Sequence, residues 1–578
     1  MPSGKREAKV ATLPLVGDPT QRNFNAAASL TSGLDQRFRG CQFVVVPDPQ
    51  KQTKNVYVEK RPGMEALSTI ASGRTGHAIS PNFPVGDFAT TNTFLVALGT
   101  GTPSRDTIYE ALGAVTTSNC GDLDPATIAR GMTVGWFSDV PVVMITAATT
   151  PPTGVKTGWY VDSGAFDALV TFTGDTHTNT TIDNISSMTG LYVGQALSGT
   201  GITAGTRIAT INVSGSSITT DTATTATNAG VTITRTHLAK IIDSDFPSGI
   251  DGPVGYMEEL NGRAFAMTWG TGRIYQSAQN NVASWAASEF ISPRKYKGYG
   301  VSLKKYGEFI IGFTSSGVSF FEYSNNPSGS SLNERPGMAF SYGVNSSYGT
   351  TAGYPIQLTS SGNNIFWTTP DFNIGIWTIR DGAPTKISGV IEDRILAGSS
   401  GSGAWINAFD QNGQHYLFAY TGANQLLYHV ESGMWSDPVF GFVPYFGDNV
   451  TAGGVISGGT SGKIYTFSDQ TPVYTDDGSA FTMTIQTDTW DGGTQDWKQI
   501  ERIELIGDTQ SSGTTTLQIS SDDYANFTTI GSFDMTQPRK ELFSGGWYQG
   551  SVAFKLTNSA NTPFRAQALR ITYKTGLA

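Results

Sequence analysis

Five histidines are the side chains of this sequence with the widest range of possible chemistry: His77, His177, His237, His415 and His429. No two of them stand at a spacing that would place both on one metal ion. His415 lies inside an alternating, strand-like run, where a packed or surface histidine is expected. The sequence also contains no Gly-x-Ser-x-Gly elbow, phosphate-binding loop or Cys-x-x-Cys pair. We therefore predict no metal and no cofactor.

Adjacent carboxylates are the candidates for acid–base chemistry. The pairs are Glu258 with Glu259, Glu392 with Asp393, and Asp476 with Asp477. A glycosidase needs two carboxylates that flank one bond, whereas neighbouring residues on a strand point to opposite faces. We expect these pairs to be solvated turn or surface charges.

One further stretch, Ser521 to Phe527, resembles the Asp-box of sialidases. It occurs once, and Ala525 and Phe527 stand where Gly and Thr are wanted, so we predict a β-turn. No catalytic residue is assigned, and the chain is predicted not to be an enzyme.

Composition indicates an all-β protein. The 578 residues include 68 Gly and 11% aromatics, but only 15% charged residues. The formal net charge of −10 argues against a surface that grips DNA, which usually needs a basic face. Cys41 and Cys120 are too few for a disulfide scaffold and are expected to be buried. No apolar run is long enough to span a membrane, and no signal peptide is recognised.

A short phrase, a polar turn with Gly followed by an apolar strand, recurs at intervals of 45 to 55 residues. Its copies begin at Asn261, Tyr306, Ser361, Asn412 and Ser461. A second Gly turn trails three of the copies by about one strand length. A period near 50 residues with several strands in each unit is typical of a β-propeller, whose blades bury their faces against one another.

These patterns predict an all-β fold: a β-propeller of about six blades with an inserted small β-domain and a C-terminal β-sandwich-like unit. Between Thr171 and Thr236, 20 of 66 residues are Thr and only two are basic, which marks the insert. The predicted divisions are an N-terminal arm (1–40), first blades (41–166), the Thr-rich insert (167–237), remaining blades (238–477) and a C-terminal unit that completes or caps the propeller (478–578).

Several motifs, in this order, resemble the tail-nozzle proteins of short-tailed bacteriophages, also called packaged-DNA stabilisation proteins. They are Leu13 to Gly17, Asp35-Gln36-Arg37, Arg61-Pro62-Gly63-Met64, Gly255 to Phe265, Ser292 to Tyr296, Gly317 to Tyr323, Arg335-Pro336-Gly337-Met338, and Lys386-Ile387-Ser388 with Ile391-Glu392. The resemblance covers about residues 10–165 and 238–470. The Thr-rich insert lies outside the family's common core, and the turn from Ser292 to Tyr296 is more basic than the family's pattern.

The resemblance implies a virion protein of the tail. It implies a homo-hexamer below the portal and its head-to-tail adaptor ring, with tail fibres or tailspikes and a tail needle or plug as further partners. Genomic DNA would pass through the channel without specific binding, since phosphate contacts would retard it. Gate loops are expected among 325–335, 398–403 and 453–462. The alternatives are a glycan- or receptor-binding phage tail protein, which needs exposed aromatics on one propeller face, and a propeller glycoside hydrolase, which needs converging carboxylates.

Overall fold

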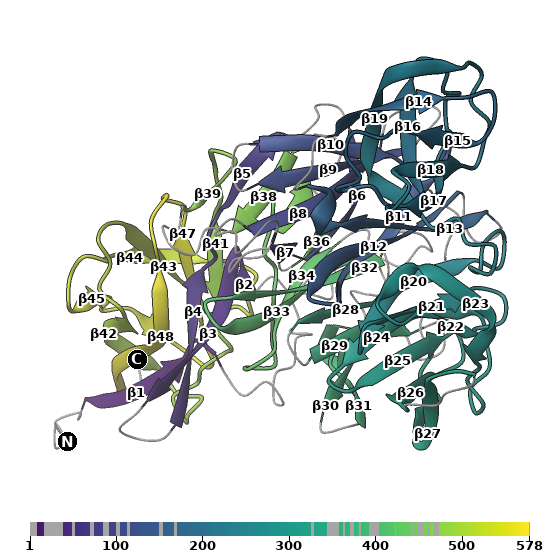
Figure 1. Ribbon diagram of the computed structural model, residues 1–578. Helices are drawn as coiled ribbons and strands as arrows, with labels where there is room; N and C mark the ends of the chain where they lie inside the picture. The colour runs from purple at the N-terminus through teal and green to yellow at the C-terminus, as the bar shows by residue number, and fades with distance from the viewer. Residues whose placement is uncertain are drawn as a thin grey trace, which may run out of the picture.

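Seven antiparallel sheets follow one another around a closed ring in the computed structural model (Figure 1). The structure describes residues 8–16, 38–48, 53–69, 74–81, 83–84, 92–99, 105–112, 116–149, 154–166, 170–324, 329–343, 358–361, 364–369, 375–380, 383–391, 404–421, 424–441, 444–448, 455–458, 463–467 and 473–576. Within these residues the secondary structure is almost entirely β-strand, with two short 3-10 helices at Ser163–Ala165 and Gly389–Ile391.

The sheets of the ring are the blades of a β-propeller. Four of them are formed by consecutive strands: β20 (Pro253–Leu260) to β23 (Asn281–Ile291), β24 (Gly300–Tyr306) to β27 (Leu332–Phe340), β28 (Leu358–Ser361) to β31 (Ala383–Lys386), and β32 (Ala404–Gln411) to β35 (Met434–Ser436). Their middle strands are β21 (Arg263–Thr268), β22 (Ile274–Ala278), β25 (Phe309–Thr314), β26 (Val318–Tyr323), β29 (Asn364–Thr369), β30 (Gly375–Arg380), β33 (Gln414–Thr421) and β34 (Gln425–His429).

Two blades precede these four in the chain. The first contains β6 (Thr75–Ile79), β8 (Asn92–Gly99), β9 (Asp106–Leu112) and β10 (Thr116–Asp122), with the short β7 (Phe83–Pro84) on β8. The second contains β11 (Ile128–Phe137), β12 (Val140–Ala148), β13 (Lys156–Asp162) and the end of β19 (Asn228–Lys240). Apolar side chains of facing blades form the cores between them, as Trp159 does between the first two.

The last blade closes the ring with a strand from the other end of the chain. Three of its strands are β36 (Pro444–Asp448), β37 (Val455–Gly458) and β38 (Lys463–Phe467). The fourth is β5 (Met64–Thr69), which pairs with β38. The sequence predicted about six blades, and seven are present among the described residues; the last of them takes its fourth strand, β5, from the other end of the chain.

A β-sandwich flanks the ring and is built from both ends of the chain (Figure 1). One sheet contains β1 (Lys9–Pro14), β3 (Cys41–Asp48), β4 (Thr53–Lys60), β42 (Lys498–Gly507), β45 (Lys540–Phe543), β46 (Trp547–Tyr548) and β48 (Arg565–Thr575). The other contains β2 (Phe38–Arg39), β41 (Met483–Gln486), β43 (Thr514–Ser520), β44 (Thr528–Asp534) and β47 (Ala553–Asn558). Side chains such as Phe43, Leu517, Phe554 and Ile571 fill the space between the sheets.

This arrangement changes two of the predicted divisions. Residues 41–60 were assigned to a blade, but β3 and β4 lie in the sandwich, because β4 pairs with β48 through Val58 and Ala566. The residues assigned to an N-terminal arm include β1, which pairs along its whole length with β48. A small hairpin of β39 (Thr475–Asp476) and β40 (Ser479–Ala480) lies where the ring joins the sandwich.

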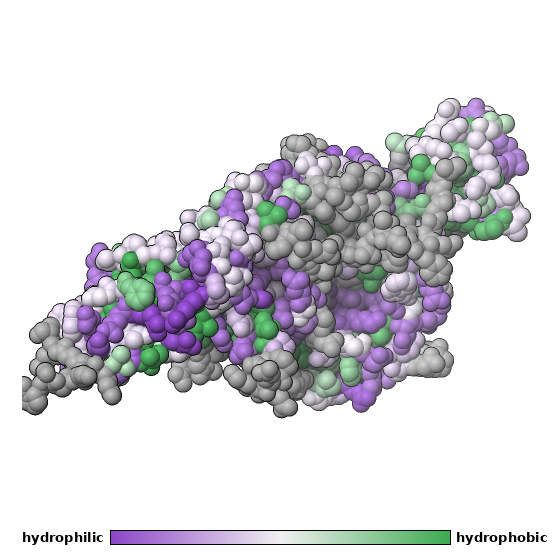
Figure 2. All heavy atoms as spheres, turned by 90° about the vertical axis from the view of Figure 1, so that its left-hand side faces the viewer, coloured by the Kyte–Doolittle hydropathy of each residue, from purple (hydrophilic) through white to green (hydrophobic). Residues whose placement is uncertain are grey.

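The Thr-rich segment forms a β unit with its own core. Its strands are β14 (Thr171–Thr176), β15 (Thr181–Asp183), β16 (Gln195–Gly199), β17 (Ile208–Asn212), β18 (Ser217–Thr220) and the first part of β19. Ile182, Ile208, Ile218 and Ile233 point into that core, while many Thr residues alternate with them on the outside. The unit stands out from the ring at the top of the molecule (Figure 1, Figure 2), and β19 continues from it into the second blade.

Candidate functional site

The blades present two different ends to solvent. Because neighbouring strands of a blade are antiparallel, the turn between its first and second strands and the turn between its second and third strands lie at opposite ends. The Asn-Gly phrases at Asn261 and Asn412 are first-to-second turns. The second-to-third turns share their end with the segments that connect one blade to the next. We call this second end the connection face.

Two aromatic rings are stacked on the connection face. Trp269 directly follows β21, and Tyr299 directly precedes β24. Their ring centroids lie 5.2 Å apart with an interplanar angle of 16°, and Tyr299 is 54% exposed. The Trp269 carbonyl accepts a hydrogen bond from Gly300 N at 2.8 Å, and Ser315 Oγ accepts one from Tyr299 N at 3.1 Å. The backbone on both sides therefore fixes this pair, which we call the aromatic platform.

A buried lysine lies beneath the platform. The Lys156 ammonium donates to the carbonyl oxygens of Gly154 at 3.0 Å and Ile250 at 2.6 Å, and it lies 5.6 Å from the Trp269 ring centroid. Burial lowers the pKa of Lys156, and the nearby Asp251 opposes that shift. The Lys156 ammonium thus has hydrogen-bond acceptors within the protein, and it holds together the loops that carry Gly154 and Ile250.

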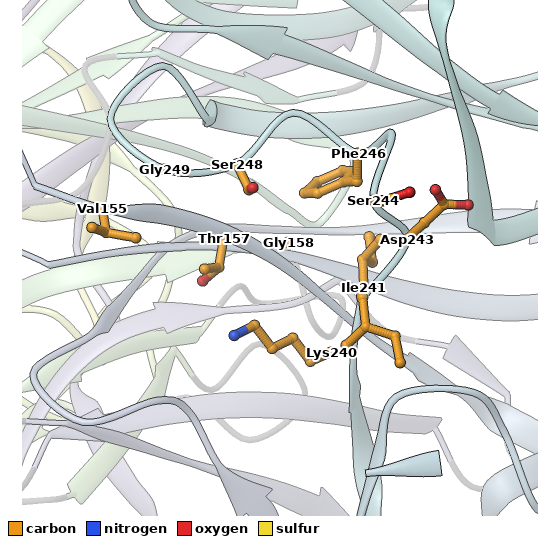
Figure 3. A pocket seen from close by; sticks show the side chains of 11 residues that line it. Val155, Thr157, Gly158, Lys240, Ile241, Asp243, Ser244, Phe246, Ser248 and Gly249 are labelled. Atoms are coloured by element: carbon orange, nitrogen blue, oxygen red, sulfur yellow. The ribbon is translucent and has the colours of Figure 1, made fainter. Parts of the chain in front are cut away.

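A pocket with a volume of 480 Å³ opens beside these residues (Figure 3). The loop that follows β19 arches over β13, so that Phe246 and Ser248 face Thr157 across the hollow. Lys240 lines it and pairs with Asp124 at 2.6 Å. The full lining is Val155, Thr157, Gly158, Lys240, Ile241, Ile242, Asp243, Ser244, Phe246, Ser248 and Gly249.

The first pair of adjacent carboxylates is buried and not solvated as the sequence predicted. Glu258 and Glu259 are buried on β20, and each pairs with a different lysine at 3.4 Å, Lys304 and Lys305 respectively. Burial raises the pKa of Glu258, while Lys304 opposes the shift. The expectation of solvated charges is wrong for this pair, because the inner strands of neighbouring blades bring opposite charges together.

Asp476 is also buried, and the expectation of a solvated charge is wrong there too. It forms an ion pair with Arg61, whereas its neighbour Asp477 pairs with the more exposed Lys463 at 2.6 Å. The third pair, Glu392 with Asp393, lies outside the described residues.

The histidines are placed as structural groups within the described chain. His77 contacts the buried Asp106 at 2.6 Å, and His177 contacts Asp183 at 3.0 Å. His415 and His429 both contact Glu431, at 2.5 and 3.0 Å. Burial alone would raise the pKa of Glu431, but hydrogen bonds with His429 and His415 outweigh it and lower that pKa to about 2. Sequence spacing did not reveal this cluster.

The remaining histidine is half-buried, and both cysteines are buried. His237 packs against Phe166, and burial lowers its pKa to about 4. Cys41 and Cys120 form no disulfide and are buried, as predicted, and burial raises the pKa of each thiol. Among the described residues, no group of three or more His, Cys, Asp or Glu is placed to hold a metal ion, and no helix is long and apolar enough to cross a membrane.

The Asp-box-like stretch is a turn in the sandwich, between β43 and β44, as predicted. Asp522 accepts hydrogen bonds from Asn526 N and Nδ2 at 3.0 and 2.7 Å, and these lower the pKa of Asp522 to about 2.

Of the expected gate loops, 398–403 lies outside the described residues, and 325–335 and 453–462 lie partly outside them.

Among known proteins, the chain is similar to solved structures, whereas family models and curated proteins give no match. Among solved structures, the chain is similar to an exo-β-1,3-galactanase from Phanerochaete chrysosporium with galactose, at 8% identity and a TM-score of 0.22, over 89% of this chain and 100% of that one. It is also similar to a Trypanosoma rangeli sialidase in complex with sialic acid, at 10% identity and a TM-score of 0.29, over 93% and 96%. A third is a Bombyx mori GH32 β-fructofuranosidase, at 8% identity and a TM-score of 0.24, over 88% and 94%.

These neighbours correct one expectation. The sequence led us to predict that the chain is not an enzyme, and that exclusion is withdrawn because the similar structures are glycoside hydrolases and a sialidase. The propeller assignment rests on the strand pairing described above, and no reaction is carried over from these structures.

Sequence reasoning missed the aromatic platform. Trp269 and Tyr299 are 30 positions apart, and each adjoins a strand with large apolar residues, so both would pass for core residues. The usable signal is that each one borders a Gly-containing turn, where side chains are commonly exposed.

Proposed function

We propose that the chain is a structural virion protein, the nozzle of a short-tailed phage tail, which forms a gated channel for the retention and ejection of DNA. The resemblance described above is the starting point. Its motifs fall at positions that define the architecture: Gly255 to Phe265 spans the hairpin of β20 and β21, and Ser292 to Tyr296 connects two blades.

The joint between propeller and sandwich is the observation that carries the proposal. Arg61-Pro62-Gly63-Met64 leads from β4 of the sandwich into β5 of the last blade. Arg61 is fully buried there and pairs with Asp476. A Cβ on Gly63 would lie 1.9 Å from Thr475 O, so this position requires glycine. A motif of the resembling family thus supplies the closure of the ring and its attachment to the second unit.

A conduit also suits the charge of the chain. Six copies would carry about −60, so a positive lumen would need strong segregation of the minority charge. DNA carries roughly one negative charge per 1.7 Å of axis, and basic contacts repeated six-fold would hold it back in a salt-dependent way. A neutral to acidic channel would let it slide.

The decisive measurement is the oligomeric state of the full chain, by light scattering and negative-stain class averages, with the adaptor ring protein added where the chain alone is monomeric. We expect six-fold rings. Double-stranded DNA at low salt should bind no more tightly than micromolar. A stable monomer that also fails to join the adaptor, or sub-micromolar DNA binding that weakens steeply with salt, would contradict the proposal.

Glycoside hydrolysis is the second candidate, and the placement of two carboxylates on the connection face favours it. Asp243 lines the pocket, and Asp251, eight positions along the same loop, accepts hydrogen bonds beside Trp269 from the Gly270 amide and the Thr271 hydroxyl. Hydrolysis of a glycosidic bond requires two carboxylates that flank it, and Asp243 and Asp251 are the pair that such a reaction would use here. We expect any such activity to be lost in both D243N and D251N. Hydrolysis unchanged in both variants would exclude this site.

A further inference from the structure

We propose that the connection face binds a neutral oligosaccharide, with one sugar ring on the aromatic platform and a neighbouring unit in the pocket. This site is independent of the nozzle proposal, because nothing in it depends on a hexamer or on DNA. It also stands whether or not the bound sugar is hydrolysed.

Exposed apolar side chains gather at this place. Nine large hydrophobic side chains are exposed among the described residues. One of them is Tyr299 of the platform (54%), and two others, Val155 (48%) and Ile250 (63%), lie on the adjoining loops. Hydrogen bonds link their loops: Lys156 Nζ donates to the Ile250 carbonyl, and Trp269 N donates to the Gly252 carbonyl. A contiguous exposed apolar patch with a polar rim marks a binding site.

The shape and chemistry of the patch fit a sugar. Two nearly parallel rings offer a flat surface, against which the apolar C–H face of a pyranose can lie. Hydroxyl groups of Ser315 and Ser316 lie beside Tyr299, and those of Ser248 and Thr157 face the pocket. A ligand with an apolar face and hydroxyl-bearing edges can contact both the aromatic rings and the neighbouring hydroxyl groups, which a wholly apolar ligand cannot do.

Three charged side chains at the site, Lys156, Lys240 and Asp251, have partners within the protein. Lys156 is held by two backbone carbonyls, and Lys240 is held by Asp124. The Asp251 carboxylate accepts hydrogen bonds from the Gly270 amide and the Thr271 hydroxyl. Lys156 and Lys240 are thus engaged by protein groups and are not arranged to capture a sialic acid carboxylate or a phosphate. The exposed Lys297, two positions before Tyr299, is a single cation near the platform.

The pocket continues the platform. Val155 lines the pocket and precedes Lys156, whose ammonium lies beneath the platform, and Gly249, which also lines the pocket, precedes the exposed Ile250. A volume of 480 Å³ falls within the range of small-ligand sites, roughly 300–1,000 Å³. A chain of two or three sugar units could therefore occupy the platform and the pocket together.

The test uses the intact protein on a printed array of neutral and sialylated oligosaccharides, followed by calorimetric titration with the neutral sugars that bind. We expect W269A and Y299A each to weaken binding at least ten-fold, and W269F to weaken it less. F543A is the matched control, since Phe543 is 77% exposed and lies on the sandwich, and it should bind like the unaltered protein.

Several outcomes would overturn the proposal. They are the absence of any neutral ligand on the array, binding restricted to sialylated sugars, and binding that survives in both W269A and Y299A. Preferential binding of single-stranded DNA at the platform would overturn it as well, since aromatic platforms also stack bases. Circular dichroism of each variant separates loss of binding from loss of fold, and Y299A removes a side chain that is already half exposed.

Discussion

Replacing Arg61 by alanine should lower the free energy of unfolding by about 3–5 kcal/mol, the usual cost of removing one partner of a buried ion pair. Arg61 is fully buried. Its guanidinium donates to Asp476 at 2.8 and 2.5 Å and to the Val439 carbonyl at 3.0 Å. It also lies 3.9 Å from the centroid of the Phe481 ring. Without it, the Asp476 carboxylate would remain buried where the ring meets the sandwich.

Urea unfolding followed by tryptophan fluorescence measures this loss. R105A is the matched control: Arg105 pairs with Asp122 at 2.5 Å, but both side chains are more than one-third exposed, so its removal should cost less than about 1 kcal/mol. The double variant R61M/D476L removes both charges and should recover part of the loss. A loss in R61A no larger than in R105A would contradict a structural role for the joint.

The local features of the propeller could be predicted because they depend on short-range chemistry. Asn261 and Gly262 have φ values of +52° and +73°, which suits a two-residue hairpin turn and explains why Asn-Gly marks it. Alternating apolar residues around such turns predicted paired strands, and the 50-residue period predicted blades. None of this required knowledge of distant parts of the chain.

The parts that were missed depend on pairing across the whole chain. Val58 pairs with Ala566 and Met64 with Phe467, and no local pattern distinguishes such a strand from one that pairs with its neighbour. The same limit applies to the sites. Arg61 and Asp476 are 415 positions apart, and whether Tyr299 is exposed depends on how loops from three blades meet.

Replacing Gly255 by alanine should cost about 2–5 kcal/mol, because it adds backbone strain to overpacking between blades. Gly255 lies in β20 with φ +67°. A Cβ there would lie 2.3 Å from Ser302 Oγ and 2.5 Å from Val301 O, both on β24 of the next blade. On its other side, a Cβ on Gly131 of β11 would lie 2.5 Å from Gly255 O. Three inner strands therefore meet at this glycine.

The variant G413A separates the free-energy cost of backbone strain from the cost of overpacking between blades. Gly413 has a similar φ of +71°, but a Cβ there meets nothing within 4 Å, so G413A carries the backbone strain alone, about 1–2 kcal/mol. Thermal unfolding of the two variants should place the G255A midpoint well below that of G413A, and G255A should accumulate less soluble protein. Equal midpoints would show that β20 and β24 are not packed this closely, and the order of blades around the ring would then need revision at this position.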